Sequence, residues 1–369
     1  MNKTPIQWTW DTAPDGTLIP MSGSTWNPIL GCKEVSAGCR ECYAARLIGT
    51  RFSKNPKLPM YHDIATTAAN GHPHFTGNRR MVPDRLDEPL RARKGRKVFV
   101  NDMGDLFFEG HPFEDIAAVF GVMAAAKQHT FQVLTKRPER AAEFFAWVAA
   151  RIEADAAKGV PHRMLAEAGV CHEAAMHAGV SETRMGPRCP PWPLPNVWIG
   201  TSVEDQASAD KRIPHLLRVP AVVRFLSMEP LLGPVDLRRI LWPDKGGHRV
   251  DVLRFGYWET ERNTGGFVNH SDMHTMFGRP IQWIIVGGES GPKARPFDLA
   301  WARSLMEQAD GTDCAVFMKQ LGARPFVEVH GVHAERIRPP RVRDSHGGVE
   351  AEWPADLQGR RAFPVARTA

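Results

Sequence analysis

The sequence lacks a membrane-length apolar run, a leader-like N-terminus and a disulfide-rich composition. No apolar stretch reaches the roughly 18–20 residues of a transmembrane helix. The first residues, "MNKTPIQWTWDTAPDG", contain no basic segment followed by an apolar core. Six cysteines among 369 residues are too few for a disulfide scaffold. We therefore expect a cytoplasmic globular protein that has no membrane partner.

Recognisable nucleotide-binding loops are also lacking. The segment "GGESG" (287–291) has neither the Lys-Ser/Thr pair of a P-loop nor a full G-x-G-x-x-G pattern. Internal repeats and long low-complexity tracts are absent as well. These absences argue against an NTPase and against a repeat architecture.

Acidic residues are outnumbered, which gives a formal net charge of +6 and a pI near 9.1. Basic residues concentrate in "RARKGRK" (91–97) and "ERIRPPRVR" (335–343). This balance favours a polyanionic partner such as nucleic acid, although a solvated basic surface would give the same charge.

Short apolar, β-rich runs alternate with helix-like segments from residue 96 to residue 322. Their nearly continuous apolar character is typical of strands buried on both faces of a parallel sheet. The alternation predicts an α/β fold, either a (β/α) barrel or a doubly wound sheet. The strand-like runs are 96–102, 130–137, 196–204, 221–230, 282–290 and 314–322, and the helix-like segments are 112–128, 137–158, 208–218 and 298–309.

Polar residues follow most of the strand-like runs. In a (β/α) barrel the carboxyl ends of the strands face one active site, so we expect most of these side chains to line a single pocket. Capping of the next helix by Asp or Ser is the structural alternative. The residues are Asn101, Asp102, Asp105, Lys136, Arg137, Thr201, Ser202, Glu204, Glu229, Glu289, Ser290, Lys319 and Gln320.

Two segments interrupt the alternation, at about 159–195 and 243–280, and both are rich in His, Gly and Pro. We expect them to be loop insertions in a partial or full (β/α) barrel domain that spans residues 1–322. Residues 323–369 lose the apolar period and are expected to form a basic, Pro-rich C-terminal extension.

Three of the six cysteines, Cys32, Cys39 and Cys42, form a C-x₆-C-x₂-C cluster. A structural zinc site usually has four protein ligands. Three thiolates suit a [4Fe–4S] cluster whose fourth iron binds a small molecule. A zinc clip remains the alternative if a distant residue completes it, and the candidates are His62, His72, His74, Cys171, His172 and Cys189.

The cysteine loop at the start of an α/β barrel resembles the radical S-adenosylmethionine (SAM) superfamily. Specifically, the chain resembles the phage-associated three-Cys-motif (Gp37/Gp68-like) family over roughly residues 24–322. The matching blocks are "TWNPILGCKEVSAGCRECYAAR", "VFVNDMGDLF", "QVLTKRPER", "WIGTSVE", "FLSMEPLLG", "IIVGGESG" and "FMKQLG". The commonest superfamily spacing is C-x₃-C-x₂-C with an aromatic residue before the third cysteine, whereas Glu41 precedes Cys42 here.

The resemblance implies that Cys32, Cys39 and Cys42 hold the cluster and that SAM binds the remaining iron through its amino and carboxylate groups. Glycines at 31 and 38 would let the backbone close around the sulfurs. The resemblance also suggests that strand-end residues bind SAM. Asn101, Asp102 and Asp105 are candidates for its ammonium; Thr201, Ser202 and Glu204 for its ribose; Lys136 or Arg137 for a carboxylate or phosphate; and Glu229 and Glu289 are further candidates.

Two hypotheses follow for the function. The first is a radical SAM enzyme that takes electrons from a donor, cleaves SAM to a 5′-deoxyadenosyl radical, and modifies or repairs a nucleic acid or nucleotide. The second is a non-catalytic, zinc-stabilised nucleic-acid-binding protein.

Overall fold

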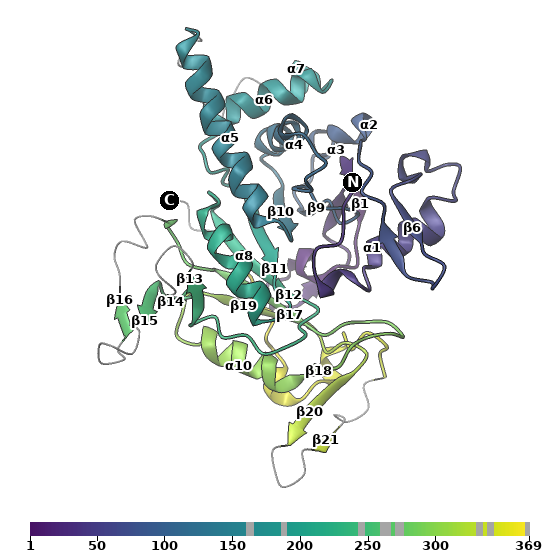
Figure 1. Cartoon of the computed structure of the whole chain (residues 1–369), viewed down its shortest axis with the longest axis vertical. Coiled ribbons are helices and arrows are strands. Elements are labelled where there is room, and N and C mark those ends of the chain that lie inside the picture. Colours follow the sequence, from purple (N-terminus) through teal and green to yellow (C-terminus); the bar gives the residue numbers. More distant parts are fainter. Residues whose placement is uncertain are drawn as a thin grey trace. The chain divides into compact units, whose positions relative to one another are not determined.

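The computed structural model describes residues 1–159, 166–185, 190–242, 248–258, 267–269, 277–329, 335–337 and 343–365. The chain divides into two units with a mixed α/β fold (Figure 1). Unit 1 comprises residues 1–200, 219–222 and 367–369, and unit 2 comprises 201–218 and 223–366. In the described part of the chain, every helix is too short or too polar to cross a membrane.

Unit 1 contains the cysteine loop and the first half of the strand–helix alternation. Its strands are β1 (Asn2–Lys3), β2 (Asp11–Thr12), β3 (Leu18–Ile19), β4 (Ser24–Trp26), β5 (Ile29–Leu30), β6 (Ala65–Thr67), β7 (Pro73–Phe75), β8 (Arg80–Met81), β9 (Lys97–Val100), β10 (Thr130–Thr135) and β11 (Val197–Ser202), which ends two residues into unit 2. Its helices and helical turns are η1 (Gln7–Thr9), η2 (Ala37–Cys39), α1 (Tyr43–Leu47), η3 (Ile48–Phe52), η4 (Pro59–Tyr61), α2 (Pro83–Leu86), α3 (Glu88–Arg91), α4 (Phe113–Ala125), α5 (Pro138–Ala157), α6 (Glu167–His177) and α7 (Glu182–Met185).

The main sheet of unit 1 is mostly parallel, with the order β1-β4-β9-β10-β11. Strand β9 pairs in parallel with β4, where Val100 lies opposite Trp26, and with β10, where Val100 lies opposite Val133. Strand β1 runs antiparallel to β4. Because neighbouring parallel strands end at one edge, the segments after β4, β9 and β10 come together there.

Helices α4, α5 and α6 pack together in unit 1 (Figure 1). Helix α4 is apolar almost all round and buried from Ile116 to Ala124, and Glu114 and Asp115 in its first turn suit the helix dipole. Helix α6 approaches α4 at Gly121, where an added Cβ would lie 2.1 Å from the Cys171 carbonyl oxygen. The described part of the segment expected as the first loop insertion is therefore largely a packed helix.

Unit 2 continues the alternation. Its strands are β12 (Val223–Met228), β13 (Ile240–Trp242), β14 (His248–Asp251), β15 (Gly256–Trp258), β16 (Phe267–Asn269), β17 (Trp283–Gly287), β18 (Phe297–Asp298), β19 (Ala315–Gln320), β20 (Pro325–Val329) and β21 (Glu335–Ile337). Its helices and helical turns are α8 (Gln206–Arg218), α10 (Leu299–Ala309), η7 (Glu350–Glu352) and η8 (Ala355–Leu357).

Strands β12, β17 and β19 are parallel and hydrogen-bonded in that order. Strands β13 to β16 form a separate antiparallel sheet. The described part of the segment expected as the second loop insertion therefore contributes strands, and the rest of both insertions lies outside the described residues.

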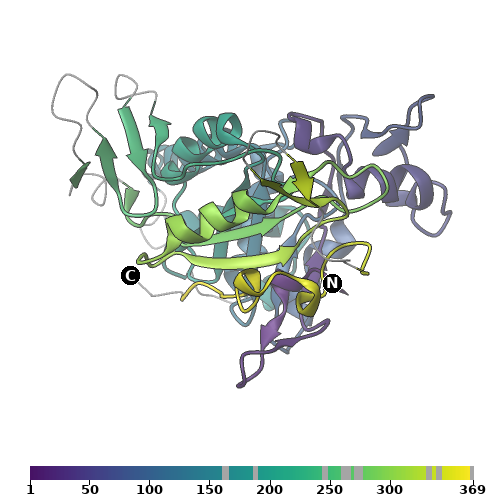
Figure 2. The same ribbon diagram turned by 90° about the horizontal axis from the view of Figure 1, so that it is seen from below.

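The C-terminal segment 343–365 is part of unit 2 and packs against its strands. Figure 2 shows α10 on one side of β17 and β19 and this yellow segment on the other. Phe363 contacts the rings of Trp283 and Phe317, with centroids 5.5 and 5.3 Å away. Leu357 is fully buried. Residues 343–365 of the expected extension thus contribute side chains to a hydrophobic core.

The predicted α/β class and parallel pairing are confirmed, and each of the six strand-like runs contains a strand: β9, β10 and β11 in the main sheet of unit 1, and β12, β17 and β19 in unit 2. Helices α4, α5, α8 and α10 occupy the four helix-like segments. Closure into a full barrel is not observed in the described residues.

Candidate functional site

The cysteine loop begins where two glycine backbones meet in unit 1. Gly31 forms a parallel β-bridge with Gly104, and the Asp105 amide donates to the Gly31 carbonyl at 3.1 Å. Gly31 has φ +135°, and a Cβ there would lie 2.6 Å from the Asn78 carbonyl oxygen. Glycine is therefore required at position 31, and it joins the loop to the segment that follows β9.

The three cysteines occupy different local structures. Cys32 follows Gly31 directly, Cys39 closes the turn η2, and Cys42 lies just before α1. Cys39 is buried, whereas Cys32 and Cys42 are partly buried against an apolar cluster that includes Leu30, Ala44 and Ile48. The segment from α1 to β8 thus supplies a hydrophobic support for the loop.

A buried arginine contacts Cys32. Nη1 of Arg137 lies 3.6 Å from Cys32 Sγ and 3.1 Å from an Asp105 carboxylate oxygen, and Nη2 donates to the Lys33 carbonyl at 2.6 Å. Nε donates to both carboxylate oxygens of Glu109 at 2.8 Å. The Arg137 side chain is only 1% exposed. Burial raises the pKa of Cys32 to about 12, and the Arg137 charge opposes that rise.

Asp105 is the centre of this network. Its carboxylate accepts from the Thr135 hydroxyl at 2.7 Å and from the backbone amides of Phe107 and Lys136, each at 3.0 Å, besides Arg137. These contacts join the loop after β9 to the end of β10. The carboxylate predicted to bind an ammonium is thus placed beside the cysteines, where it organises the protein.

Cys42 has a different electrostatic environment. Burial raises the pKa of its thiol, while the backbone amides of Ala45 and Ala44 and the Lys136 ammonium act in the opposite direction. Lys136 therefore lies near the cysteine loop, as expected of a strand-end residue.

The donor set suits an iron–sulfur cluster in number and kind, because three thiols on one loop meet a cation and backbone amides. In the residues described, no group of three or more His, Cys, Asp or Glu side chains is arranged to hold a single metal ion. Of the possible fourth zinc ligands, His72 contacts Glu34 at 2.9 Å and Cys171 is buried in α6. His62, His74 and His172 lie within the described residues and belong to no such group there, whereas Cys189 lies outside the described residues.

Asn101, the residue directly after β9, has an unusual backbone conformation and an unpaired buried side chain. It is a non-glycine residue with φ +59°, it is 2% exposed, and neither its Oδ1 nor its Nδ2 has a hydrogen-bond partner among the residues described. Buried amides are almost always hydrogen-bonded, so this side chain is a candidate to meet a ligand or an ordered water.

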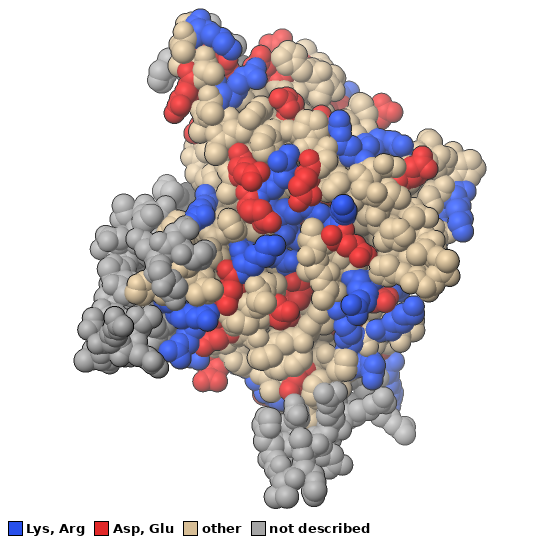
Figure 3. Space-filling view, in the orientation of Figure 1, with Lys and Arg blue, Asp and Glu red and all other residues tan. Residues whose placement is uncertain are grey.

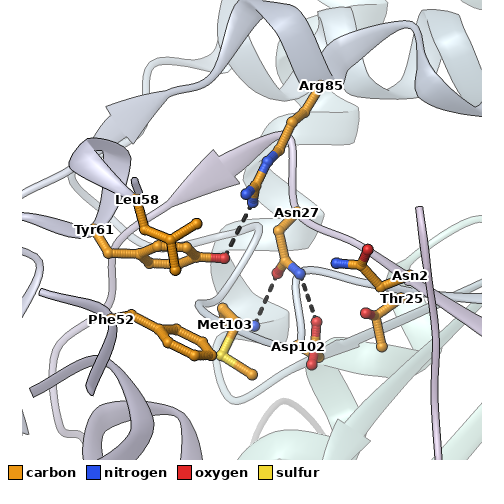
Figure 4. A pocket seen from close by; sticks show the side chains of 9 residues that line it. All are labelled: Asn2, Thr25, Asn27, Phe52, Leu58, Tyr61, Arg85, Asp102 and Met103. Atoms are coloured by element: carbon orange, nitrogen blue, oxygen red, sulfur yellow. Dashed lines mark hydrogen bonds between the residues drawn. The ribbon is translucent and has the colours of Figure 1, made fainter. Parts of the chain in front are cut away.

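Asp102 lines a cavity of about 160 Å³ (Figure 4). Its carboxylate accepts from Asn27 at 2.6 Å, and the Tyr43 hydroxyl donates to its carbonyl at 2.9 Å. Burial raises the pKa of this carboxyl. The remaining lining residues are Asn2, Thr25, Phe52, Leu58, Tyr61, Arg85 and Met103. The cavity thus has an aromatic and aliphatic wall opposite amide and carboxylate groups.

The other predicted residues lie mostly in unit 2, where several are engaged in ion pairs. Glu204 accepts from Arg212 at 2.6 Å, Glu229 from Lys319 at 2.6 Å, and Glu289 from Arg295 at 2.6 Å. Thr201 and Ser202 are buried. Gln320 donates to the Gly288 carbonyl at 2.8 Å, which brings the ends of β17 and β19 together.

The sequence did not indicate three features of the unit 1 site. These are the contact between Arg137 and the Cys32 sulfur, the Glu109 carboxylate that accepts from Arg137 Nε, and the hydrogen bond from Asn27 to Asp102. The only local signal is that Arg137 follows a strand, and the contact joins residues 105 positions apart.

The distribution of charged side chains does not indicate a nucleic-acid-binding surface on the face drawn in Figure 3. Figure 3 shows Lys and Arg intermingled with Asp and Glu on that face, rather than a continuous basic surface. The positive formal charge is therefore the remaining support for a polyanionic partner.

The family described as "Protein of unknown function (DUF5131)" matches residues 16–344. The match covers most of the chain, which therefore belongs to this family. No curated protein and no solved structure matches the chain.

Proposed function

We propose that this member of the DUF5131 family is a radical SAM-type iron–sulfur enzyme of the three-Cys-motif kind, acting on a nucleic acid or nucleotide. One observation carries the proposal. The three thiols of Cys32, Cys39 and Cys42 lie on a loop that is fixed at the carboxyl ends of parallel strands, beside buried polar groups.

In this proposal the three cysteine thiolates hold a [4Fe–4S] cluster and leave its fourth iron for SAM. When bound, and once reduced by an electron donor, the cluster would supply the electron for reductive cleavage of SAM to a radical able to abstract hydrogen from a substrate. Asp102 accepts hydrogen bonds from an ammonium, and Lys136 pairs with a carboxylate. Asn101 supplies an amide donor and acceptor. The apolar wall of Phe52, Leu58 and Met103 excludes water from the cavity.

Iron and sulfide analysis of anaerobically reconstituted protein tests the cofactor. We expect about four irons per chain and an EPR signal of the reduced protein that changes when SAM is added. The Cys32→Ala, Cys39→Ala and Cys42→Ala variants should each lose iron. Cys314→Ala is the matched control, because Cys314 is also a buried free cysteine but lies in unit 2. Stoichiometric zinc without iron would support the zinc-binding alternative instead.

The substrate class follows from the positive net charge and is tested separately. Fluorescence anisotropy with single-stranded DNA, duplex DNA and RNA should show binding that weakens steeply as salt rises, because bound phosphates release counterions. If the protein binds none of these at low salt, a nucleic-acid substrate is excluded, and a free nucleotide remains as the proposed substrate.

A further inference from the structure

Arg137 is the buried cation that contacts a predicted cluster ligand. All but one of its N–H groups have an assigned acceptor: Glu109 for Nε, Asp105 and Cys32 for Nη1, and the Lys33 carbonyl for Nη2. Its guanidinium carbon also lies 5.3 Å from the centre of the Phe108 ring. The side chain is thus held from several directions and is not available to bind a ligand carboxylate or phosphate.

The arrangement places one N–H on the Cys32 sulfur and another on the backbone of the next residue. Lys33 O also accepts from Cys32 Sγ at 3.6 Å, so the guanidinium holds both the thiol and the carbonyl beside it. Asp105 fixes Nη1 from the scaffold side and is itself held by Thr135. A chain of contacts therefore runs from β10 to the sulfur of the first cysteine.

We propose that Arg137 is a positioning residue that hydrogen-bonds to the Cys32 sulfur and raises the reduction potential of the cluster, a role that rests on the proposed function. Reduction adds negative charge to the cluster, and an N–H donor with a positive charge at a ligand sulfur favours the more negative state. The partner carboxylates act oppositely, but Glu109 is 58% exposed and is screened by solvent, which leaves Asp105 as the main opposing charge.

Because Arg137 and Asp105 carry opposite charges, replacing each of them should shift the reduction potential of the cluster in opposite directions. Arg137→Gln removes the cation and leaves Asp105 uncompensated, so reduction should become about tenfold less favourable, a shift of about 59 mV towards more negative potential. Asp105→Asn removes the carboxylate charge and keeps Arg137, so the potential should rise. Arg137→Lys keeps the charge but loses the fork that reaches sulfur and carbonyl together, so its potential should lie between those of wild type and Arg137→Gln.

The experiment is an EPR-monitored redox titration of the reconstituted full-length chain, with iron content and circular dichroism measured on each sample. Arg140→Gln is the matched control, because Arg140 lies in the first turn of α5, three residues after Arg137, but packs on the Phe113 ring and donates to the His111 carbonyl. Its potential should equal that of wild type.

The outcomes separate the two proposals. A normal cluster in wild type with unchanged potentials in both Arg137 variants would overturn the role of Arg137 and leave the proposed function standing. Loss of iron from both variants in folded protein would also overturn it, because Arg137 would then only shape the loop. A wild-type protein that binds no iron would overturn the proposed function and this inference together.

Discussion

At the level of single residues, His111 is buried and its ring nitrogens have no hydrogen-bond partner among the described residues. It is 1% exposed, its ring lies edge-on to Phe108 at 5.5 Å, and neither ring nitrogen has a hydrogen-bond partner in the part of the chain described. Burial lowers the pKa of His111 to about 4, against the opposing effect of Asp105. The folded protein therefore keeps this imidazole neutral at pH values where the unfolded chain protonates it.

We predict that the free energy of unfolding falls as pH decreases from about 6.5 to about 4, because below pH 6.5 the unfolded state binds a proton that folded His111 does not. The slope from this one group is about 1.4 kcal/mol per pH unit. Urea unfolding of wild type and His111→Gln at several pH values in this range measures the slope. The free energy of unfolding of the variant should depend less steeply on pH. Identical profiles for wild type and His111→Gln would contradict the assignment of this pH dependence to His111.

Asn101 allows a test of ligand contact that is separate from folding. Glycine tolerates its φ of +59° and removes the unpaired amide, so Asn101→Gly should change the free energy of unfolding by less than about 1 kcal/mol. Affinity for SAM should fall at least about tenfold if the amide bonds to the ligand, as a lost hydrogen bond of about 1.4 kcal/mol would give. Isothermal titration calorimetry of SAM binding to the reconstituted proteins measures this difference. An unchanged Kd for SAM would contradict the proposed contact between Asn101 and the ligand.

Single-residue contacts were the least predictable from the sequence. The strand-end rule identified Asp105 and Lys136, but not that the Asp105 carboxylate is occupied by Thr135, Arg137 and two backbone amides. Such contacts depend on side chains brought together by the fold. A pattern within one segment therefore cannot specify them.

At the scale of elements, apolar runs were sufficient to predict six strands, β9 to β12, β17 and β19, and four helices. Helix α6 was missed because its sequence, "EAGVCHEAAMH", consists mainly of small and polar residues without a strong apolar stripe. Its position depends on Gly121 of α4, which lets the two helices approach closely. That information lies about fifty residues earlier in the chain.

Replacing Gly121 with valine should destabilise unit 1 by about 1–3 kcal/mol, because the new side chain cannot fit beside the Cys171 carbonyl and the helices must move apart. Thermal unfolding followed by circular dichroism measures the change. The control is Gly233→Ala, where an added Cβ meets only Asp205 Cβ at 3.6 Å. Equal stability of both variants would show that α6 does not depend on this close approach.

At the scale of the whole molecule, the C-terminal residues belong to a core that the sequence did not reveal. Composition predicted a basic, Pro-rich extension, and local apolar periodicity is indeed weak there. Trp353 and Leu357 are nevertheless buried, and the Trp283 indole donates to the Ala362 carbonyl at 3.0 Å. The apolar residues are too widely spaced to give a helical or strand period, and their burial depends on unit 2.

Leu357→Ala should therefore destabilise the protein by about 2–5 kcal/mol, as expected for truncation of a fully buried leucine. Val365→Ala, at a side chain that is 74% exposed, should change stability by less than about 0.5 kcal/mol. Chemical denaturation monitored by tryptophan fluorescence provides the comparison. If both variants match wild type, residues 343–365 do not contribute to the folded core.

The bridge between Gly31 and Gly104 also bears on how related sites can be found. The loop is anchored at its start by this glycine pair and at its end by Tyr43 on the Asp102 carbonyl. Between these anchors the chain can be longer or shorter without moving either one. A fixed interval between the first two cysteines is then a poor search pattern. A better one is a glycine directly before the first cysteine, paired with an N-D-M-G-D segment that closes a downstream strand.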